Sequence, residues 1–280
     1  MQEIVGIAAG VPYVALPPVG TPEGESAPLV VAWHLHDPPR SERAMGAALP
    51  LKGLPAWRVY LGLPLSGSRL PDGGLEAFFQ LSYQDAVLKV FSPVCRQAVE
   101  EFPLALAALR TELPLGEGPL GLLGGSVGAL VALSVLAETD LPVGAVALVS
   151  PAIRLAGVVA ANERRFDVTY PWTDQSRAVA ERLDFVARAG ELVKRDAAVL
   201  LVVGALDDQE GIRAPAEQLW QRLSRHAPDR TALTTIPEMA HALAEEPGLD
   251  PAPQTPQAAR VDTVVAGWFH RHLTGSRSAS

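Results

Sequence analysis

The segment from Gly124 to Gly128, which reads G-x-S-x-G, constrains the fold of this chain more than any other. An apolar run at residues 119–123 predicts a buried strand before it, and a second run at 129–133 predicts a buried helix after it. A serine in so tight a turn needs strained backbone angles and small neighbours. Such a turn exposes the hydroxyl, which favours a nucleophilic Ser126; the alternative is a glycine-rich loop with an ordinary N-cap serine.

The rest of the chain alternates between strand-like and helix-like patterns. Short continuous apolar runs, typical of strands covered on both faces, lie at residues 29–33, 57–63, 144–149 and 197–203, with further candidates at 3–8, 13–16 and 231–236. Helical spacing lies between them, at 41–49, from a possible cap at Ser92, at 212–223 and at 261–272. This order predicts an α/β fold, a mostly parallel twisted sheet with helices on both faces.

Length and composition suit one domain over residues 1–275, because the chain has 280 residues and 48% of them are hydrophobic. The small polar residues 275–280 are expected to be a disordered tail. Residues 151–196 are too long for a simple crossover, and they predict a small helical cap insertion with an amphipathic helix over 174–193. The alternative is a surface excursion without a role in binding.

Aromatic side chains mark the expected substrate pocket. Tyr170 and Trp172 lie in the predicted cap, and Phe78 lies in a glycine-rich and aromatic segment at 66–91 that does not fit the alternation. In open α/β sheets ligands bind at the carboxyl edge of the strands, where a cap would cover them. We therefore expect Tyr170, Trp172 and Phe78, together with His34, to bind the substrate.

Charge and targeting signals exclude several partners. The formal net charge is −8 and no basic stripe is visible, so we expect no binding to nucleic acid or to an anionic membrane. No apolar run reaches 18 residues, and the first residues lack the pattern of a secretory signal. The single cysteine, Cys95, precludes an intrachain disulfide. A cytoplasmic location is expected, and nothing in the sequence indicates an oligomeric state.

A nucleophilic serine needs a histidine to accept its proton and an acid to orient that histidine. Asp207 follows the strand-like run 197–203, so its carboxylate is expected at the same sheet edge as Ser126; Asp208 is the reserve candidate and Asp167, in the predicted cap, a distant one. Of the six histidines, only His241 both follows the acid in the chain and lies on a loop after a strand candidate.

Taken together, these segments resemble those of α/β-hydrolases, of the smaller esterase or dienelactone-hydrolase-like kind, over about residues 29–273. The chain order of serine, acid and histidine agrees. The resemblance implies that Ser126 is the nucleophile, His241 the general base and then acid, and Asp207 the group that orients the histidine. It implies hydrolysis of a small or medium acyl or aryl ester through an acyl-enzyme, with no cofactor.

Hydrolases of this kind use two backbone N–H groups to hold the oxyanion. One is expected from Val127, directly after the nucleophile. The second is expected from Leu35 or His36, after the strand at 29–33, where this chain lacks the glycine that related enzymes often have. His34 and His36 also resemble half of a metal site, but Asp37 is the only nearby third ligand, and we expect no metal.

Other activities use the same residues. A thioesterase, acyltransferase, peptidase or lactonase would share this triad, and so would a perhydrolase that uses peroxide in place of water. A non-catalytic ligand-binding protein on the same fold is the alternative from a different class. A small-molecule ester remains the expected partner.

Overall fold

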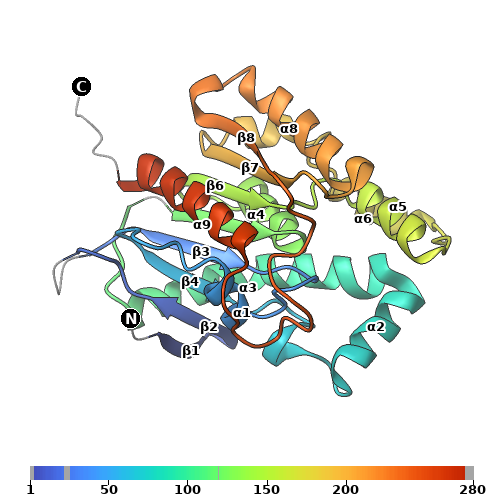
Figure 1. The fold of residues 1–280 in the computed structure, drawn as a ribbon, viewed down its shortest axis with the longest axis horizontal. Coiled ribbons are helices and arrows are strands. Elements are labelled where there is room, and N and C mark those ends of the chain that lie inside the picture. Colours follow the sequence, from blue (N-terminus) through green and yellow to red (C-terminus); the bar gives the residue numbers. More distant parts are fainter. Residues whose placement is uncertain (1–2, 22–25, 119, 275–280) are drawn as a thin grey trace.

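The computed structural model describes residues 3–21, 26–118 and 120–274, and it contains one eight-stranded sheet (Figure 1). In sheet order the strands are β1 (Ile4–Ala8), β2 (Val11–Leu16), β4 (Trp57–Leu61), β3 (Leu29–Trp33), β5 (Leu120–Gly125), β6 (Val143–Val149), β7 (Ala198–Gly204) and β8 (Thr231–Ile236). β1 and β2 form an antiparallel hairpin, β2 is antiparallel to β4, and all later pairs are parallel. The predicted mostly parallel α/β sheet is confirmed.

Helices cover both faces of this sheet (Figure 1). They are α1 (Glu42–Ala48), α2 (Gly74–Asp85), α3 (Ser92–Glu112), α4 (Val127–Glu138), α5 (Leu155–Phe166), α6 (Asp174–Arg182), α7 (Ala189–Val193), α8 (Ala214–Ser224) and α9 (Pro256–Phe269). One hydrophobic layer joins the sheet to α3, α4 and α8, and a second joins it to α1 and α9. The two layers explain why β5, β6 and β7 are apolar along almost their whole length: both faces of these strands are buried.

The segment 66–91 differs from the sequence-based expectation. α2 continues through a π-helical segment (Ala86–Phe91) into α3, so Ser92 lies inside the helical run and its interpretation as a helix cap is wrong. Pro93 in the next turn has no N–H to donate, and the wider π-helical turn comes directly before it. The side chain of Asp85 accepts a hydrogen bond from the Leu88 amide at 2.8 Å.

The helix expected over 174–193 is also interrupted. α6 ends at Arg182 and α7 begins at Ala189. Between them, the amide of Phe185 donates to the carbonyl of Ile153 at 3.0 Å, and the amide of Leu155 donates to the carbonyl of Leu183 at 3.1 Å. Pairing with the chain ahead of α5 therefore takes these backbone groups away from a continuous helix. α5 itself was not anticipated.

Figure 1 shows α5 and α6 at the same end of the molecule as α2. In the described part of the chain, no helix combines the length and apolar character needed to cross a membrane. Residues 1–2, residue 119, where the predicted strand began, and 275–280, the predicted disordered tail, lie outside the described residues.

Candidate active site

Ser126 occupies a strained turn between β5 and α4. Its φ of 46° and ψ of −113° are sparsely populated by residues other than glycine, and such conformations cost about 1–3 kcal/mol. The Ser126 amide donates to Val149 at 3.0 Å, and the Ser126 carbonyl accepts from Ala152 at 3.2 Å, so the end of β6 holds the turn. The side chain makes no capping hydrogen bond to α4, so the interpretation as an ordinary N-cap serine is wrong.

The glycines that flank Ser126 allow two close backbone approaches. A Cβ atom on Gly124 would lie 2.3 Å from the carbonyl oxygen of Gly128. A Cβ atom on Gly128 would lie 2.5 Å from the Trp33 carbonyl oxygen and 2.7 Å from that of His34. Since real Cβ atoms essentially never come within 3.0 Å of such atoms, both positions require glycine. The turn thus lies directly against the end of β3.

The structure brings Ser126, His241 and Asp207 into one hydrogen-bonded line. Nε2 of His241 lies 2.9 Å from Oγ of Ser126, and Nδ1 lies 3.0 and 3.1 Å from the two carboxylate oxygens of Asp207. Asp207 can only accept when ionised, so Nδ1–H donates to it and Nε2 accepts the serine proton; this tautomer is assigned from the network. A serine, a base and an orienting acid in this order can perform nucleophilic catalysis.

Backbone hydrogen bonds hold the acid and histidine loops together. The Leu206 amide donates to the Met239 carbonyl at 2.9 Å. A Cβ atom on Gly204 would lie 2.3 Å from that same carbonyl oxygen, so only glycine permits the approach at the end of β7. The loop after β8 therefore passes close enough for His241 to reach Asp207.

The two other candidate acids lie elsewhere. Asp208 accepts from the amides of Glu210 and Gly211 at 3.1 and 2.6 Å and pairs with Arg164 at 3.0 Å. Asp167 ends α5 in a left-handed conformation, with φ of 52°. Of the three carboxylates, only Asp207 hydrogen-bonds to His241.

Electrostatics hold the imidazole of His241 closer to its charged form than usual. Burial lowers the pKa of His241, but the hydrogen bond and charge of Asp207, together with the charge of Asp37, outweigh that effect, and Arg165 opposes them weakly. The net pKa is raised above its usual 6.5. A base with a raised pKa accepts the serine proton more readily, as general base catalysis requires.

Two of the backbone amides considered as oxyanion donors are free: that of Val127, directly after Ser126, and that of His36. In the described part of the chain, no group accepts a hydrogen bond from the Val127 or the His36 amide, whereas the Leu35 amide already donates to the Pro39 carbonyl at 3.3 Å. Of the two alternatives from the sequence, the structure thus leaves His36. Arg40 holds the peptide that follows: its Nε donates to the His36 carbonyl at 2.7 Å, and its guanidinium pairs with Glu246 in the loop after His241.

His34 is a structural residue, contrary to the expectation that it binds substrate. Its ring is fully buried, with Nδ1 2.7 Å from the carbonyl oxygen of Leu35 and Nε2 accepting from the Leu63 amide at 3.3 Å. Burial lowers the pKa of His34 to about 4, so the ring is neutral. Both nitrogens are occupied, which leaves no lone pair for a metal. Within the described residues, no three His, Cys, Asp or Glu side chains form a possible metal site.

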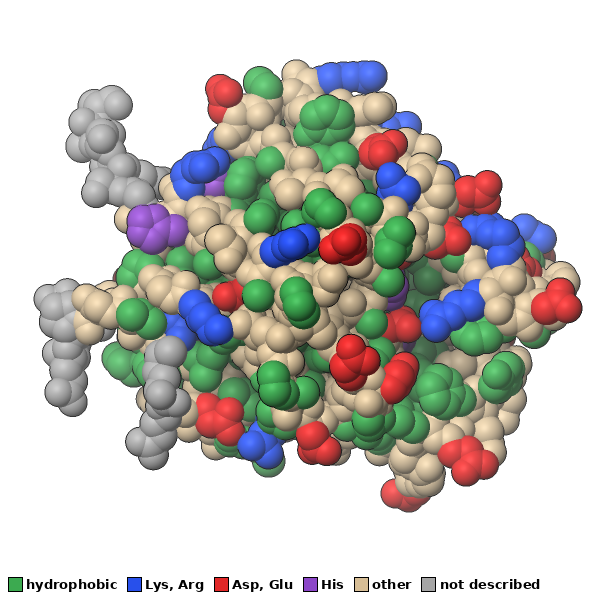
Figure 2. Space-filling view, viewed as in Figure 1, with side chains coloured by type: hydrophobic (Ala, Val, Ile, Leu, Met, Phe, Trp, Pro, Cys, Tyr) green, Lys and Arg blue, Asp and Glu red, His purple; other side chains and the backbone are tan. Residues whose placement is uncertain are grey.

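Phe78 packs against the proposed oxyanion loop. It is buried, and its ring meets that of His36 edge-on at 5.1 Å between centroids. Its neighbours on α2, Phe79 and Tyr83, are 44% and 75% exposed, and Figure 2 shows apolar side chains over this helix at the lower right. The aromatic surface that the sequence indicated therefore lies partly beside the site and partly on the outside.

Tyr170 and Trp172 connect the segment after α5 to the end of α2. The Tyr170 hydroxyl donates to Asp85 at 2.5 Å, and the Trp172 ring packs edge-on against that of Tyr170 at 4.8 Å. Neither side chain hydrogen-bonds to Ser126 or His241, all four being described residues. The structure thus shows them joining two elements near the site, and their expected contact with substrate remains a prediction.

Sequence reasoning missed Asp37 as a member of the site, because it considered this residue only as a metal ligand. Oδ2 of Asp37 lies 3.8 Å from Nε2 of His241, and Oδ1 lies 3.5 Å from Arg165 on α5. Its position directly after His36 was the available signal.

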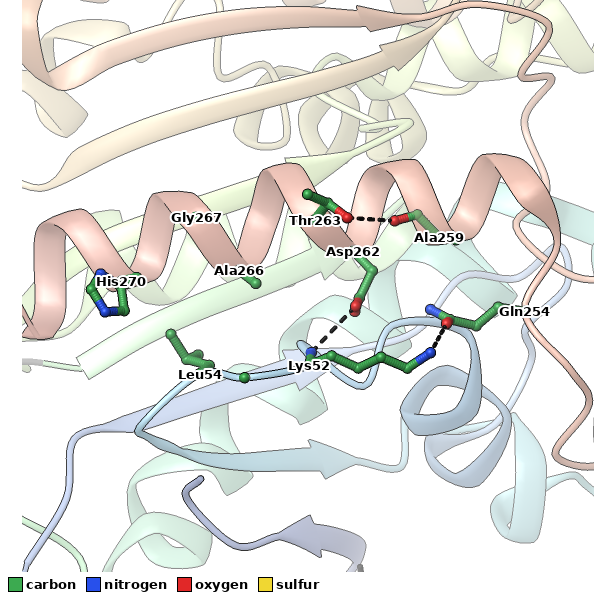
Figure 3. A pocket seen from close by; sticks show the side chains of 10 residues that line it. Lys52, Leu54, Gln254, Ala259, Asp262, Thr263, Ala266, Gly267 and His270 are labelled. Atoms are coloured by element: carbon green, nitrogen blue, oxygen red, sulfur yellow. Dashed lines mark hydrogen bonds between the residues drawn. The ribbon is translucent and has the colours of Figure 1, made fainter. Parts of the chain in front are cut away.

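One cavity lies away from this site, against α9 (Figure 3). It has a volume of about 380 Å³ and lies between α9 and the segment before β4. Its polar groups satisfy one another: Lys52 donates to Gln254 at 2.6 Å, and Asp262 accepts from the amides of Leu51 and Lys52 at 2.6 and 3.3 Å. We assign no chemistry to it.

No protein-family profile and no curated protein matches this sequence. Solved structures do match it. A puromycin-hydrolysing peptidase of Mycobacterium tuberculosis is 18% identical over 96% of this chain and 40% of its own, with a TM-score of 0.65. Carboxyl esterase 2 of the mycorrhizal fungus Tuber melanosporum is 20% identical over 97% and 87%, with a TM-score of 0.60. Dienelactone hydrolase of Anabaena variabilis is 19% identical over 97% and 98%, with a TM-score of 0.58.

The likeness to these proteins is one of fold. The chain spans two fifths of the length of the peptidase and nearly the whole length of the dienelactone hydrolase. Their activities differ from one another, so the likeness leaves the substrate of this chain open.

Proposed function

The chain has the α/β-hydrolase fold, and we propose that it is a serine hydrolase of small or medium carboxylic esters. The proposal rests on the hydrogen bonds that join Ser126, His241 and Asp207. Oγ of Ser126 lies 2.9 Å from Nε2 of His241, and Nδ1 of His241 lies 3.0 Å from Oδ1 of Asp207. The backbone of Ser126 is strained, and the amide of the next residue, Val127, is free to donate.

In the acylation step, Oγ of Ser126 attacks the ester carbonyl carbon while its proton passes to Nε2 of His241. The carbonyl π electrons move to the oxygen, and the amides of Val127 and His36 hold that oxyanion. Each such donor is worth roughly 3 kcal/mol in related enzymes. The carbon–alkoxy bond then breaks, and the leaving oxygen takes the proton from Nε2. The alcohol departs and Ser126 is acylated.

Deacylation repeats the steps with water as the nucleophile. His241 accepts a proton from the water, whose oxygen attacks the acyl carbon. The bond to Oγ of Ser126 breaks, Oγ takes the proton back from Nε2, and the carboxylic acid leaves. Asp207 stays ionised throughout and stabilises the imidazolium that forms twice in the cycle.

We further propose that residues 151–196, which contain α5, α6 and α7, act as a cap insertion within a single domain. Ion pairs from α5 to two loops of the site support this role: Arg164 pairs with Asp208, after β7, at 3.0 Å, and Arg165 with Asp37, after β3, at 3.5 Å. Tyr170 and Trp172 belong to the same segment.

A peptidase is the second candidate, because the structures that this chain resembles include peptidases as well as esterases. Its triad would be the same, and so would that of a thioesterase, acyltransferase or lactonase. Ester hydrolysis is the less demanding reaction for this triad, because the oxygen of an ester leaves more readily than the nitrogen of an amide. A peptide p-nitroanilide, tested beside the ester, distinguishes the two.

The proposal is tested by hydrolysis of p-nitrophenyl butyrate with the wild type, Ser126→Ala and a matched variant, Ser150→Ala. Ser150 is also a buried serine at a strand end with positive φ, 41°, but its hydroxyl has no partner within the described residues. We expect Ser126→Ala to lose about 10⁴–10⁶-fold in kcat and Ser150→Ala to stay within about threefold of the wild type. Equal activity in Ser126→Ala would refute the proposal. A wild type that binds esters without turnover would favour a binding protein.

A further inference from the structure

Asp37 places a second carboxylate beside the proposed general base. Oδ2 of Asp37 lies 3.8 Å from Nε2 of His241, the nitrogen that faces Ser126. Asp207 lies on the other side of the imidazole, at Nδ1. The Asp37 side chain is 28% exposed, so its carboxylate is reached from the solvent side of the site.

The other oxygen of Asp37 faces Arg165 on α5, at 3.5 Å. The Arg165 side chain is 61% exposed, and a contact of this length from an exposed guanidinium to a partly exposed carboxylate is weak and exchangeable. α5 does not depend on it, because the neighbouring Arg164 pairs with Asp208 at 3.0 Å and with Glu210 at 2.9 Å. Figure 2 shows basic and acidic side chains side by side over this end of the molecule. Arg165 can therefore turn away from Asp37 while α5 stays in place.

The position of Asp37 relative to the leaving group follows from the reaction. The leaving oxygen receives its proton from Nε2 of His241, so it comes within about 3 Å of that atom. Substituents two or three atoms further along the alcohol then lie within reach of Oδ2 of Asp37. An ionised carboxylate only accepts hydrogen bonds and attracts positive charge. A cation on the alcohol is attracted there, whereas a carboxylate is repelled.

We propose that Asp37 forms a cation subsite for the leaving group, so that the preferred substrates are esters whose alcohol carries an ammonium group two or three atoms from the ester oxygen. This inference rests on the proposed ester hydrolysis. Arg165 is the internal competitor: it occupies Asp37 in the free protein, and the substrate cation displaces it.

The test compares two esters of the same shape, butyrylcholine and 3,3-dimethylbutyl butyrate, which differ in a charged nitrogen against a neutral carbon. The quantity measured is the ratio of their kcat/KM values for the wild type, Asp37→Asn and Arg165→Gln. Any effect of a substitution on His241 itself acts on both esters and cancels in this ratio. We expect Asp37→Asn to lower the ratio about fivefold, in line with a partly exposed ion pair. Arg165→Gln removes the competitor and raises the ratio about twofold.

Raising the salt concentration gives a second readout on the wild type. From 0.05 to 0.5 M salt the ratio is expected to fall toward its value in Asp37→Asn, because salt screens the partly exposed pair. A ratio unchanged in both variants and in salt overturns the cation subsite. If hydrolysis of the neutral ester requires Ser126 but the ratio of the two kcat/KM values is the same in the wild type and both variants, only the cation subsite is refuted. If neither ester is hydrolysed, the proposed function fails with it.

Discussion

Replacing Gly128 by alanine tests how the structure positions the oxyanion donors. Gly128 lies in the first turn of α4, two residues after Ser126. The new Cβ atom would lie 2.5 Å from the Trp33 carbonyl oxygen and 2.7 Å from that of His34, both backbone atoms. Trp33 and His34 lead directly into the loop that carries the His36 amide. The substitution therefore pushes the proposed second donor away from the first.

The structure sets the size of this effect. Restoring the 3.0 Å limit from 2.5 Å requires a shift of at least 0.5 Å between α4 and the end of β3. A misplacement of about 1 Å costs catalysis roughly 10²-fold, so about 10–100-fold is expected in kcat/KM. Overpacking costs about 2–3 kcal/mol, and the better helix propensity of alanine offsets at most about 1 kcal/mol. A net loss of about 1–2 kcal/mol lowers Tm by roughly 2–8 °C.

Gly267→Ala is the matched control, because it makes the same substitution in an exposed turn of α9. No atom lies within 4 Å of its added Cβ, so alanine should stabilise the helix by about 0.5–1 kcal/mol. Both variants are assayed with p-nitrophenyl butyrate and by differential scanning fluorimetry. We expect opposite shifts in Tm and a loss of kcat/KM in Gly128→Ala alone. If Gly128→Ala keeps wild-type kcat/KM and gains stability as the control does, the argument from the close approach is wrong.

Three further predictions concern the candidate acids, the protonation of His241 and the buried His34. Asp207→Asn should lower kcat about 10³–10⁴-fold, by analogy with serine proteases. Asp208→Asn loses a helix cap and the ion pair with α5, so it should lower Tm and leave kcat within about threefold of the wild type. Equal losses of kcat in the two variants would contradict the assignment of Asp207 as the acid. The pKa of His241 is raised above 6.5 and only the neutral imidazole accepts a proton, so kcat/KM for the neutral ester should fall as the pH drops through a midpoint above 6.5. Asp37→Asn should move that midpoint to lower pH. A wild-type midpoint below 6.5 would count against the network of Asp207, Asp37 and Arg165. His34→Ala should lower the free energy of unfolding by about 2–4 kcal/mol, because it opens a cavity and leaves the Leu63 amide without its acceptor. Urea unfolding measures this loss, and an unchanged unfolding midpoint would show that His34 is not structural.

The parts of the site that were predictable are those with a local signal. The strand, the glycines and the helix around Ser126 are contiguous, so the turn was visible in the sequence. Asp207 and His241 each follow a strand, and the rule that parallel strands end at one sheet edge placed them together before their contact was known. The edge strands gave weaker signals because they are less completely buried, as the exposed Val5 and Ile7 of β1 show.

The parts that the sequence leaves open or misses depend on contacts between distant segments. Nothing near Leu35 and His36 tells which amide is free, since the choice follows from the Pro39 carbonyl, which accepts from Leu35. Nothing near His34 in the sequence tells that its ring is buried and accepts from the distant Leu63 amide. The approach of Asp37 to His241 and Arg165 likewise joins three segments that lie far apart in the chain.

The central claim, that Ser126 is a nucleophile activated by His241, is tested most directly by intact-mass measurement after reaction with a fluorophosphonate. We predict one covalent adduct per chain, mapped by peptide analysis to Ser126, absent from Ser126→Ala, and formed much more slowly in Asp207→Asn. An unmodified wild-type chain, or an adduct on another residue that persists in Ser126→Ala, would contradict the account.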